Sequence, residues 1–274
     1  MNMWVYLIIL AIVQGIGEFL PISSSGHLAI LGSYFGIKED QNLTLGILLH
    51  AGSLAAIIIF YFKVLLGFFS KKNFHLLLMI ILGSIPCGVI GVTLKLTGLD
   101  DKIFSDPISI ALAFLVTGML LRISGKEKMV AKSNGPEATD LENITVKQSL
   151  MVGFAQAFAI LPGISRSGST ISMGLFTGVK RESAATFSFL LALPAVGGAT
   201  FLELLSMLKS KSSGVDCSNL QLIAAVVISA VVSYFSLTLL VNLVKKGKLA
   251  WFSWYLFAIG AIVFLYEAYK LSGK

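Results

Sequence analysis

Charged side chains are scarce in this sequence. Asp, Glu, Lys and Arg make up only 13% of its 274 residues, whereas hydrophobic residues make up 56% and the mean hydropathy is +0.87. Soluble domains are about a quarter charged, so a chain this apolar cannot cover its own surface with polar groups. It also lacks a polar stretch long enough for a separate soluble domain. These shortages argue against a soluble or nucleic-acid-binding protein and predict a multi-pass membrane protein surrounded by lipid.

Cysteine is nearly absent as well. Cys87 and Cys217 lie far apart and neither has the spacing of a metal ligand, so we interpret both as small core or loop residues. The chain begins with "MNM" before apolar residues and shows neither the basic region nor the cleavage site of a signal peptide. We therefore expect the first apolar segment to be retained.

Apolar segments fill most of the chain. They occupy approximately 3–20, 22–36, 44–62, 74–94 and 107–123, and then 148–161, 165–179, 184–207, 219–243 and 250–269. The last three of each set approach the roughly 20 residues that cross a bilayer, whereas the first two are short and interrupted by Pro, Gly and Ser. We predict an all-α polytopic membrane protein, residues 1–274 forming one integral domain. Each half contains a re-entrant helix pair and three transmembrane helices.

The two halves align without gaps at an offset of 142 residues. "ISSSGHLAILGSYFGI" (22–37) then lies over "ISRSGSTISMGLFTGV" (164–179). One constant offset that registers both Ser-Gly clusters indicates a duplication, with repeat 1 at about 1–124 and repeat 2 at about 146–270. Because three crossings is an odd number, the second repeat should be inverted, a recurrent membrane architecture. The polar segment at about 124–145 is predicted to be a cytoplasmic linker.

Loop charge predicts the orientation. Thirteen Lys and Arg residues fall in loops on one side of the predicted membrane domain and seven fall on the other. The richer side should be cytoplasmic, which places both termini on the outer face. The first re-entrant pair then enters from outside and the second from the cytoplasm.

Two interrupted turns carry most of the polar side chains. We call residues 17–27 ("GEFLPISSSGH") the first elbow and residues 162–170 ("PGISRSGST") the second elbow. Non-helical backbone survives at membrane depth only where protein or a watery cavity surrounds it, so both elbows should line one shared cavity. The polar candidates in the elbows are Glu18, Ser23, Ser24, Ser25 and His27 in the first, and Ser165, Arg166, Ser167, Gly168, Ser169 and Thr170 in the second.

Arg166 points to an anionic ligand. An Arg at mid-membrane costs about 3 kcal/mol on insertion scales, so it needs a partner. Its forked guanidinium suits phosphate, and the helix start after Gly168 offers backbone N–H groups for an anion. The simpler alternative is a structural ion pair between Arg166 and Glu18, with the small serines serving close helix packing.

A metal and a nucleophile are also predicted in the first elbow. Gln14 and Glu18 lie four residues apart on one helix face, where Glu18, and more weakly Gln14, would hold a divalent cation such as Mg²⁺, or alternatively Ca²⁺. Either Ser24 or His27 is expected to be the nucleophile, with Glu18 or His27 as its base. His50 is expected at most to support the site.

At these residues the chain resembles the bacterial undecaprenyl-pyrophosphate phosphatases linked to bacitracin resistance. The family's [E/Q]xxxE motif reads Gln14 to Glu18 here and continues into "FLPISSSGH", and its PGxSRSxxT motif stands intact at 162–170. The block "AATFSFLLALPAVGGA" (184–199) is also similar. The resemblance covers essentially the full length; the one departure is Gln14, where many members have Glu.

The resemblance implies removal of the terminal phosphate of a C55 isoprenoid diphosphate, which recycles the lipid carrier for peptidoglycan synthesis. It also implies an inverted-repeat fold in the bacterial plasma membrane, dependence on a divalent metal, and a site open to the outer face. Glu18, His27 and Arg166 match the family's essential positions and Ser24 matches its proposed nucleophile. Whether the protein is a monomer or a homodimer is left open.

Other functions fit parts of the pattern. An isoprenyl-phosphate flippase or transporter would use the same inverted-repeat architecture, although transport would not require Ser24, His27 and Glu18 together. A site of the acid-phosphatase type found in the lipid-phosphatase superfamily would need a Lys-Arg-Pro stretch and a downstream His and Asp, which the sequence lacks. A purely structural membrane protein is disfavoured by the cost of Arg166.

Overall fold

The computed structural model describes residues 3–36, 39–69, 73–97, 106–126, 129, 133–210 and 217–272, and these are almost entirely helical. The first half contains α1 (Met3–Phe19), α2 (Ser24–Tyr34), α3 (Glu39–Phe60), α4 (Phe62–Leu66), the 3-10 helix η1 (Gly67–Phe69), α5 (Phe74–Thr97) and α7 (Pro107–Ser124). The second half contains the 3-10 helix η3 (Leu141–Asn143), α9 (Val146–Phe158), α10 (Arg166–Phe176), α11 (Arg181–Ser210), α12 (Asn219–Lys245) and α13 (Trp251–Leu271).

Each apolar segment predicted from the sequence forms one of these helices. Local sequence signals determine where several of them begin. Asp106 caps α7, accepting from the backbone N–H of Ser109 at 3.0 Å, and Pro107 occupies the first turn, where no N–H is needed. Hydrogen bonding to Ser109 lowers the pKa of Asp106. Thr145 and Gln148 form a capping box at the start of α9. The short α4 was not foreseen.

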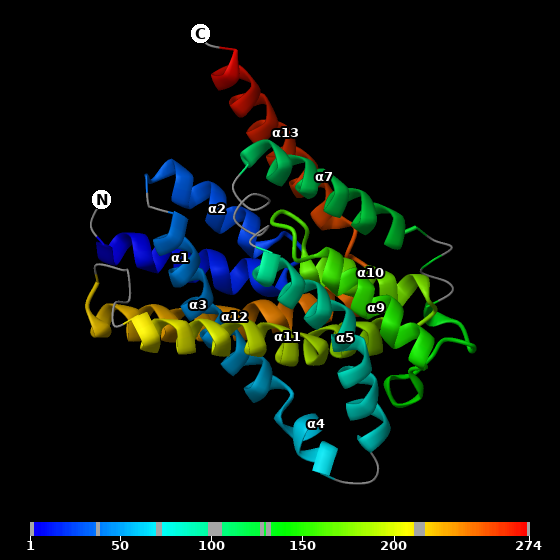
Figure 1. The fold of residues 1–274 in the computed structure, drawn as a ribbon. Coiled ribbons are helices and arrows are strands. Elements are labelled where there is room, and N and C mark those ends of the chain that lie inside the picture. The colour runs from blue at the N-terminus through cyan, green and yellow to red at the C-terminus, as the bar shows by residue number, and fades with distance from the viewer. Residues whose placement is uncertain are drawn as a thin grey trace.

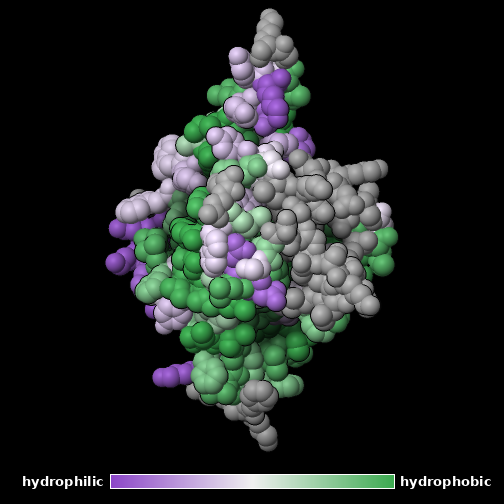
Figure 2. Space-filling view, turned by 90° about the vertical axis from the view of Figure 1, so that its left-hand side faces the viewer, coloured by the Kyte–Doolittle hydropathy of each residue, from purple (hydrophilic) through white to green (hydrophobic). Residues whose placement is uncertain are grey.

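The described surface is that of a membrane protein. Five of the described helices are long and apolar enough to cross a bilayer: Phe74–Leu94 of α5, α7, Arg181–Leu202 of α11, α12 and α13. The sixth predicted crossing is α3, whose apolar part, Leu45–Phe60, is shorter. Hydrophobic residues cover most of the coloured surface in Figure 2, an arrangement suited to lipid rather than to water. The protein is therefore a polytopic all-α membrane protein.

The second half repeats the packing plan of the first. α1 packs on α2 and α12, just as α9 packs on α10 and α5. α3 packs on α12 as α11 packs on α5, while α3 meets α11 and α7 meets α13 across the two halves (Figure 1). The duplication of the two halves stays a prediction. Inversion of the second half relative to the membrane stays a prediction.

Glycine lets the short helices approach the long ones closely. A Cβ on Gly15 of α1 would lie 2.8 Å from Val232 of α12, and a Cβ on Gly153 of α9 would collide with the backbone of Gly83 in α5. Small residues at such crossings are typical of membrane helix packing. Hydroxyl groups also form hydrogen bonds between helices. The Oγ atoms of Ser53 in α3 and Ser233 in α12 lie 2.9 Å apart. The two glycine contacts hold α1 against α12 and α9 against α5, and α1 and α9 lead into the elbows.

The described part of the predicted linker is more ordered than a plain solvated connection. The Thr139 N–H donates to the Gly178 carbonyl and the Lys180 N–H donates to the Thr139 carbonyl, both at 2.9 Å. Ser133 and Ile144 are buried. Residues 133–145 thus pack against the loop between α10 and α11.

Candidate functional site

The first elbow reverses the chain between α1 and α2 at close quarters. Gly17 permits the approach, because a Cβ there would come within 2.9 Å of the Ser24 Cα. Ser23 caps α2, its Oγ accepting from the Gly26 N–H at 3.4 Å. Its φ of 68° is the only positive value at a non-glycine position among the residues that the structure describes. Such a conformation is rare for residues with a Cβ, and where it occurs it often marks a functional site.

The second elbow joins α9 to α10 and is held by α7. Gly163 has a φ of 90°, and a Cβ there would lie 2.6 Å from the Ile110 carbonyl oxygen. Thr117 of α7 donates to the Gly163 carbonyl at 3.1 Å and accepts from the Ser165 N–H at 3.0 Å. Ser165 in turn caps α10 by accepting from the Gly168 N–H at 3.1 Å. Arg166 is thereby fixed as the first residue of α10.

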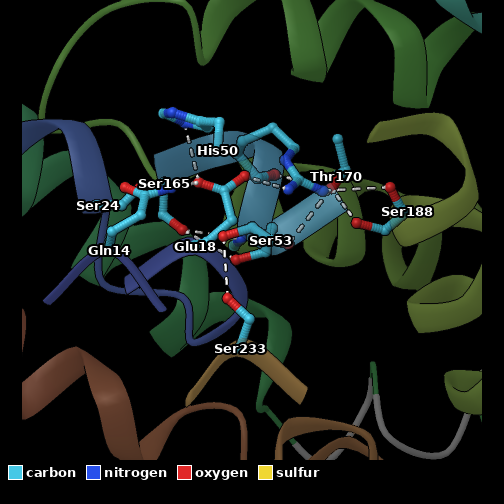
Figure 3. A network of polar contacts seen from close by, with 12 residues as sticks. Gln14, Glu18, Ser24, His50, Ser53, Ser165, Thr170, Ser188 and Ser233 are labelled. Atoms are coloured by element: carbon cyan, nitrogen blue, oxygen red, sulfur yellow. Dashed lines mark hydrogen bonds and ion pairs between the residues drawn. The ribbon is translucent and has the colours of Figure 1, made fainter. Parts of the chain in front are cut away.

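The two elbows meet through an ion pair. Arg166 Nη2 donates to Glu18 Oε1 at 2.7 Å, with the side chains only 14% and 6% exposed. The residues predicted to converge from opposite halves therefore do so, as Figure 3 shows around Glu18. Two buried charges tolerate this position only because they are paired and hydrogen-bonded.

The other Glu18 oxygen accepts from three side chains. Gln14 Nε2 lies 3.0 Å from Oε2, Ser24 Oγ lies 2.9 Å away, and His50 Nε2 lies 3.2 Å away (Figure 3). The Nδ1 atom of His50 faces the Gly46 carbonyl at 2.6 Å. Because both ring nitrogens face acceptors, this geometry suits a ring that donates at both. The sequence predicted at most a supporting role for His50, whereas the structure shows it in direct contact with the Glu18 carboxylate.

Ser188 of α11 is a further contact that the sequence did not single out. Arg166 Nη1 donates to the Ser188 carbonyl at 3.4 Å, and the Ser188 hydroxyl lies 2.5 Å from that of Thr170. Thr170 also donates to the Arg166 carbonyl at 2.7 Å. The Arg166 Nε is buried and has no hydrogen-bond partner among the described residues. The Nε–H of the guanidinium is therefore free to donate to another group.

The site offers few ligands for the predicted cation, which stays a prediction. The described residues contain no group of three or more His, Cys, Asp or Glu side chains that could bind a metal. The Gln14 Oε1 atom is buried, however, and finds no partner within the part of the chain that the structure describes. It lies on the turn next to Glu18, so one hard oxygen without a partner accompanies the carboxylate. Mg²⁺ often takes one or two protein oxygens and completes its shell with phosphate and water.

His27 lies away from this cluster. Its Nδ1 faces the Ser23 carbonyl at 2.8 Å and its Nε2 faces the Tyr255 hydroxyl of α13 at 2.7 Å. The sequence placed His27 beside Ser24 and Glu18, but its ring nitrogens face Ser23 and Tyr255 instead of those two side chains. Its role as nucleophile or base stays a prediction.

The remaining predicted binding residues lie in the first turns of α2 and α10. Ser25 is exposed, and its hydroxyl lies 3.4 Å from that of Ser23. Ser167 is buried, with its Oγ 3.2 Å from that of Ser165. These hydroxyls lie beside the start of a helix rather than on the Glu18 carboxylate, a position suited to binding an anion.

Known proteins are similar to this sequence along nearly its whole length. The family model described as bacitracin resistance protein BacA matches residues 7–262. An undecaprenyl-diphosphatase of Carboxydothermus hydrogenoformans is 36% identical over 261 residues, 95% of this chain and 96% of that protein. Proteins of the same name from Rhodopirellula baltica and Treponema denticola are 39% and 40% identical over 259 and 273 residues, each 94% of this chain and 96% of the relative. The matched region includes both elbows.

Proposed function

Because the chain belongs to the family of the bacitracin resistance protein BacA, we propose that it hydrolyses undecaprenyl diphosphate to the monophosphate and inorganic phosphate. This reaction recycles the lipid carrier of peptidoglycan synthesis and thereby supports bacitracin resistance. The observation that carries the proposal is the contact between Glu18 and Arg166, since it joins a carboxylate, a guanidinium and the Ser24 hydroxyl within one buried group.

The chemistry assigned to the site is phosphoryl transfer through Ser24. Its hydroxyl already donates to Glu18 Oε2, so the carboxylate is placed to accept the proton as Ser24 Oγ attacks the terminal phosphorus. The bond from that phosphorus to the bridging oxygen breaks, and the lipid monophosphate leaves. Water then hydrolyses the phosphoserine, releasing inorganic phosphate and restoring the hydroxyl. Contacts at Ser24 favour this residue over His27 as nucleophile.

Arg166 and the start of α10 are proposed to bind the diphosphate. The guanidinium donates to Glu18 through Nη2 and to the Ser188 carbonyl through Nη1, and its Nε–H, which has no partner among the described residues, is assigned to a phosphate oxygen. Positive charge held in place before the reaction stabilises the charge that develops in the transition state, which is the largest contribution in phosphoryl transfer. The hydroxyls of Ser165 and Ser167 line the same helix start.

A divalent cation, Mg²⁺ or alternatively Ca²⁺, is proposed to be held by Glu18 and by the Gln14 amide oxygen. Gln14 Oε1 and the carboxylate fit this group because they are hard oxygen donors on adjacent turns of one helix. When bound, the cation would neutralise charge on the diphosphate. Because two protein oxygens are a weak site, binding should be completed by the substrate.

The membrane setting explains the location of the site. A C55 chain stays among apolar helices while its diphosphate reaches the elbows, so the chemistry belongs where the substrate is anchored. From the loop charges we assign both termini and the opening of the site to the outer face of the membrane. We also propose that the second repeat is inverted relative to the first.

The direct test uses purified full-length protein in detergent with undecaprenyl diphosphate and Mg²⁺. The expected result is release of one inorganic phosphate per substrate, with the monophosphate as the lipid product. Turnover should also be seen with a C15 diphosphate. No release from either substrate in the presence of metal would instead support the flippase or transporter interpretation, which the names of the relatives do not favour.

A further inference from the structure

His27 is bound on both sides by groups outside the Glu18 cluster. Nδ1 lies 2.8 Å from the Ser23 carbonyl oxygen, and Nε2 lies 2.7 Å from the Tyr255 hydroxyl. The rings of His27 and Tyr255 are stacked, with centroids 5.7 Å apart and planes at 11°. Phe114 of α7 packs on the imidazole from another direction at 5.0 Å. Position and plane of the imidazole are thus fixed by α7 and α13.

The partners also determine which nitrogen carries the proton. A carbonyl oxygen only accepts, so the hydrogen bond to Ser23 requires a hydrogen on Nδ1. In the neutral ring Nε2 is then an acceptor, and the Tyr255 hydroxyl donates to it. The assignment follows from the hydrogen-bond network. A histidine held in this way has both nitrogens engaged and no free lone pair directed at Ser24.

The Ser23 carbonyl is the point at which this arrangement meets the first elbow. It accepts from the His27 backbone N–H at 3.3 Å as well as from the His27 ring. Ser23 is the residue with the positive φ, and the next residue, Ser24, presents its hydroxyl to Glu18 at 2.9 Å. A backbone in a sparsely populated conformation persists only where its surroundings hold it. Two hydrogen bonds from one residue to this carbonyl provide such a restraint.

We propose that His27 is a positioning residue that holds the Ser23 backbone so that Ser24 Oγ stays on Glu18, and that Tyr255 acts through His27 by fixing its tautomer and ring plane. This proposal rests on the proposed function, in which Ser24 is the nucleophile. It assigns proton transfer from Ser24 to Glu18 alone. Tyr255, far away in the sequence on α13, becomes part of the machinery of the first elbow.

Substitutions at His27 separate positioning from base catalysis. The amide nitrogen of Asn overlays Nδ1 and can donate to the Ser23 carbonyl, whereas that of Gln overlays Nε2; neither amide can serve as a base. We expect His27→Asn to keep about a tenth or more of wild-type kcat with KM within about twofold. His27→Ala and His27→Gln should lose about a hundredfold or more. If His27→Asn is as inactive as His27→Ala, while both fold and bind substrate, the positioning role is overturned.

Tyr255 supplies the second arm of the test. Tyr255→Phe keeps the stacked ring and removes only the hydroxyl, so its kcat should fall about three- to tenfold, to the level of His27→Asn. In the His27→Ala background the same change should have no further effect, because Tyr255 acts through His27. An equal loss in both backgrounds would overturn the coupling. Tyr255→Leu, which also removes the ring, should lower kcat further than Tyr255→Phe.

A spectroscopic measurement keeps the inference independent of turnover. The chain has three histidines, so ¹⁵N spectra of histidine-labelled protein can be assigned with single substitutions. His27 should show the pattern of a neutral ring protonated at Nδ1, and Tyr255→Phe should shift its Nε2 resonance. An Nε2-protonated ring would contradict the proposal even in an active enzyme. Failure of wild-type turnover with this pattern intact would instead count against the proposed function alone.

Discussion

Glu18 and Arg166 are 148 positions apart in the sequence, yet their side chains meet at 2.7 Å inside the helix bundle. Each residue comes from the elbow of a different half. Leaving either charge buried without a partner would be costly in free energy. The pair alone would satisfy a structural role. What distinguishes the site is that Gln14, Ser24 and His50 also converge on the same carboxylate, more contacts than an ion pair needs.

Arg166 is expected to require its forked geometry as well as its charge. Arg166→Ala should lower kcat/KM for undecaprenyl diphosphate by about 10²–10³-fold, because the donors that stabilise the developing phosphate charge are removed. Arg166→Lys should restore little, since one ammonium cannot reach both Glu18 and a phosphate oxygen. The matched control is Arg122→Ala, an arginine stacked on Trp254, which should keep normal turnover. Near-normal activity of Arg166→Lys would contradict the need for a guanidinium that holds Glu18 and a phosphate oxygen at once.

His50 is expected to support Glu18 through its Nε2–H. His50→Ala should lower kcat by roughly tenfold, since one of the three donors to Glu18 Oε2 is lost, at a cost on the order of 1–3 kcal/mol. His50→Gln retains an N–H in reach of the carboxylate and should recover most of that loss. Phosphate-release kinetics on both variants provide the measurement. If the Gln variant is as slow as the Ala variant, the hydrogen bond is not the relevant property of His50.

The Gln14 amide oxygen is expected to determine the Mg²⁺ concentration that the enzyme requires. Chelation with EDTA should abolish turnover and added Mg²⁺ should restore it. Gln14→Glu adds a second carboxylate and should lower the Mg²⁺ concentration required for half-maximal rate, whereas Gln14→Leu should raise it, since carboxylate and amide oxygens are the ligands that Mg²⁺ takes. Titration of the initial rate with Mg²⁺ measures both changes. An identical Mg²⁺ requirement in all three proteins would remove Gln14 from the proposed cation site.

Close packing of α9 on α5 is expected to be essential for stability. Gly153→Ala places a Cβ against the Gly83 backbone, which cannot move aside as a flexible side chain would, so the variant should lose about 1–3 kcal/mol of stability. Gly88→Ala in α5 is the control, because a Cβ there meets nothing within 4 Å. It should be neutral or slightly stabilising. Thermal unfolding in detergent compares them, and equal melting temperatures would contradict the packing argument.

The helices and the convergence of the elbows were predictable from the sequence, whereas part of the site was not. Pro, Gly and Ser divide the apolar segments, and the shared offset brings the elbows of the two halves into register. His50 lies inside an apolar helix without a local motif, and Ser188 lies in the block 184–199 without being singled out there, so only packing of α3 and α11 against the elbows reveals their contacts. His27 follows Ser24 by three residues, but its ring reaches Tyr255 on α13, a contact that no pattern in the sequence indicates.

Substitution of Ser24 tests whether this residue, and not His27, is the nucleophile. Ser24→Ala should lower kcat by at least ~10³-fold, as removal of a nucleophile does, while substrate binding is kept. The control is Ser84→Ala in α5, whose hydroxyl donates to the Ile80 carbonyl of its own helix at 2.7 Å. It should leave turnover unchanged. A Ser24→Ala enzyme with an unaffected rate would transfer the nucleophile role to His27.

The most direct measurement is to trap the phosphorylated enzyme. Rapid acid quenching during turnover of undecaprenyl diphosphate labelled in its terminal phosphate, followed by peptide mass spectrometry, should locate acid-stable phosphoserine at Ser24. The label should be absent from Ser24→Ala and should accumulate if hydrolysis of the intermediate is slowed. An acid-labile phosphate on His27, or turnover in which neither residue is ever labelled, would contradict the account.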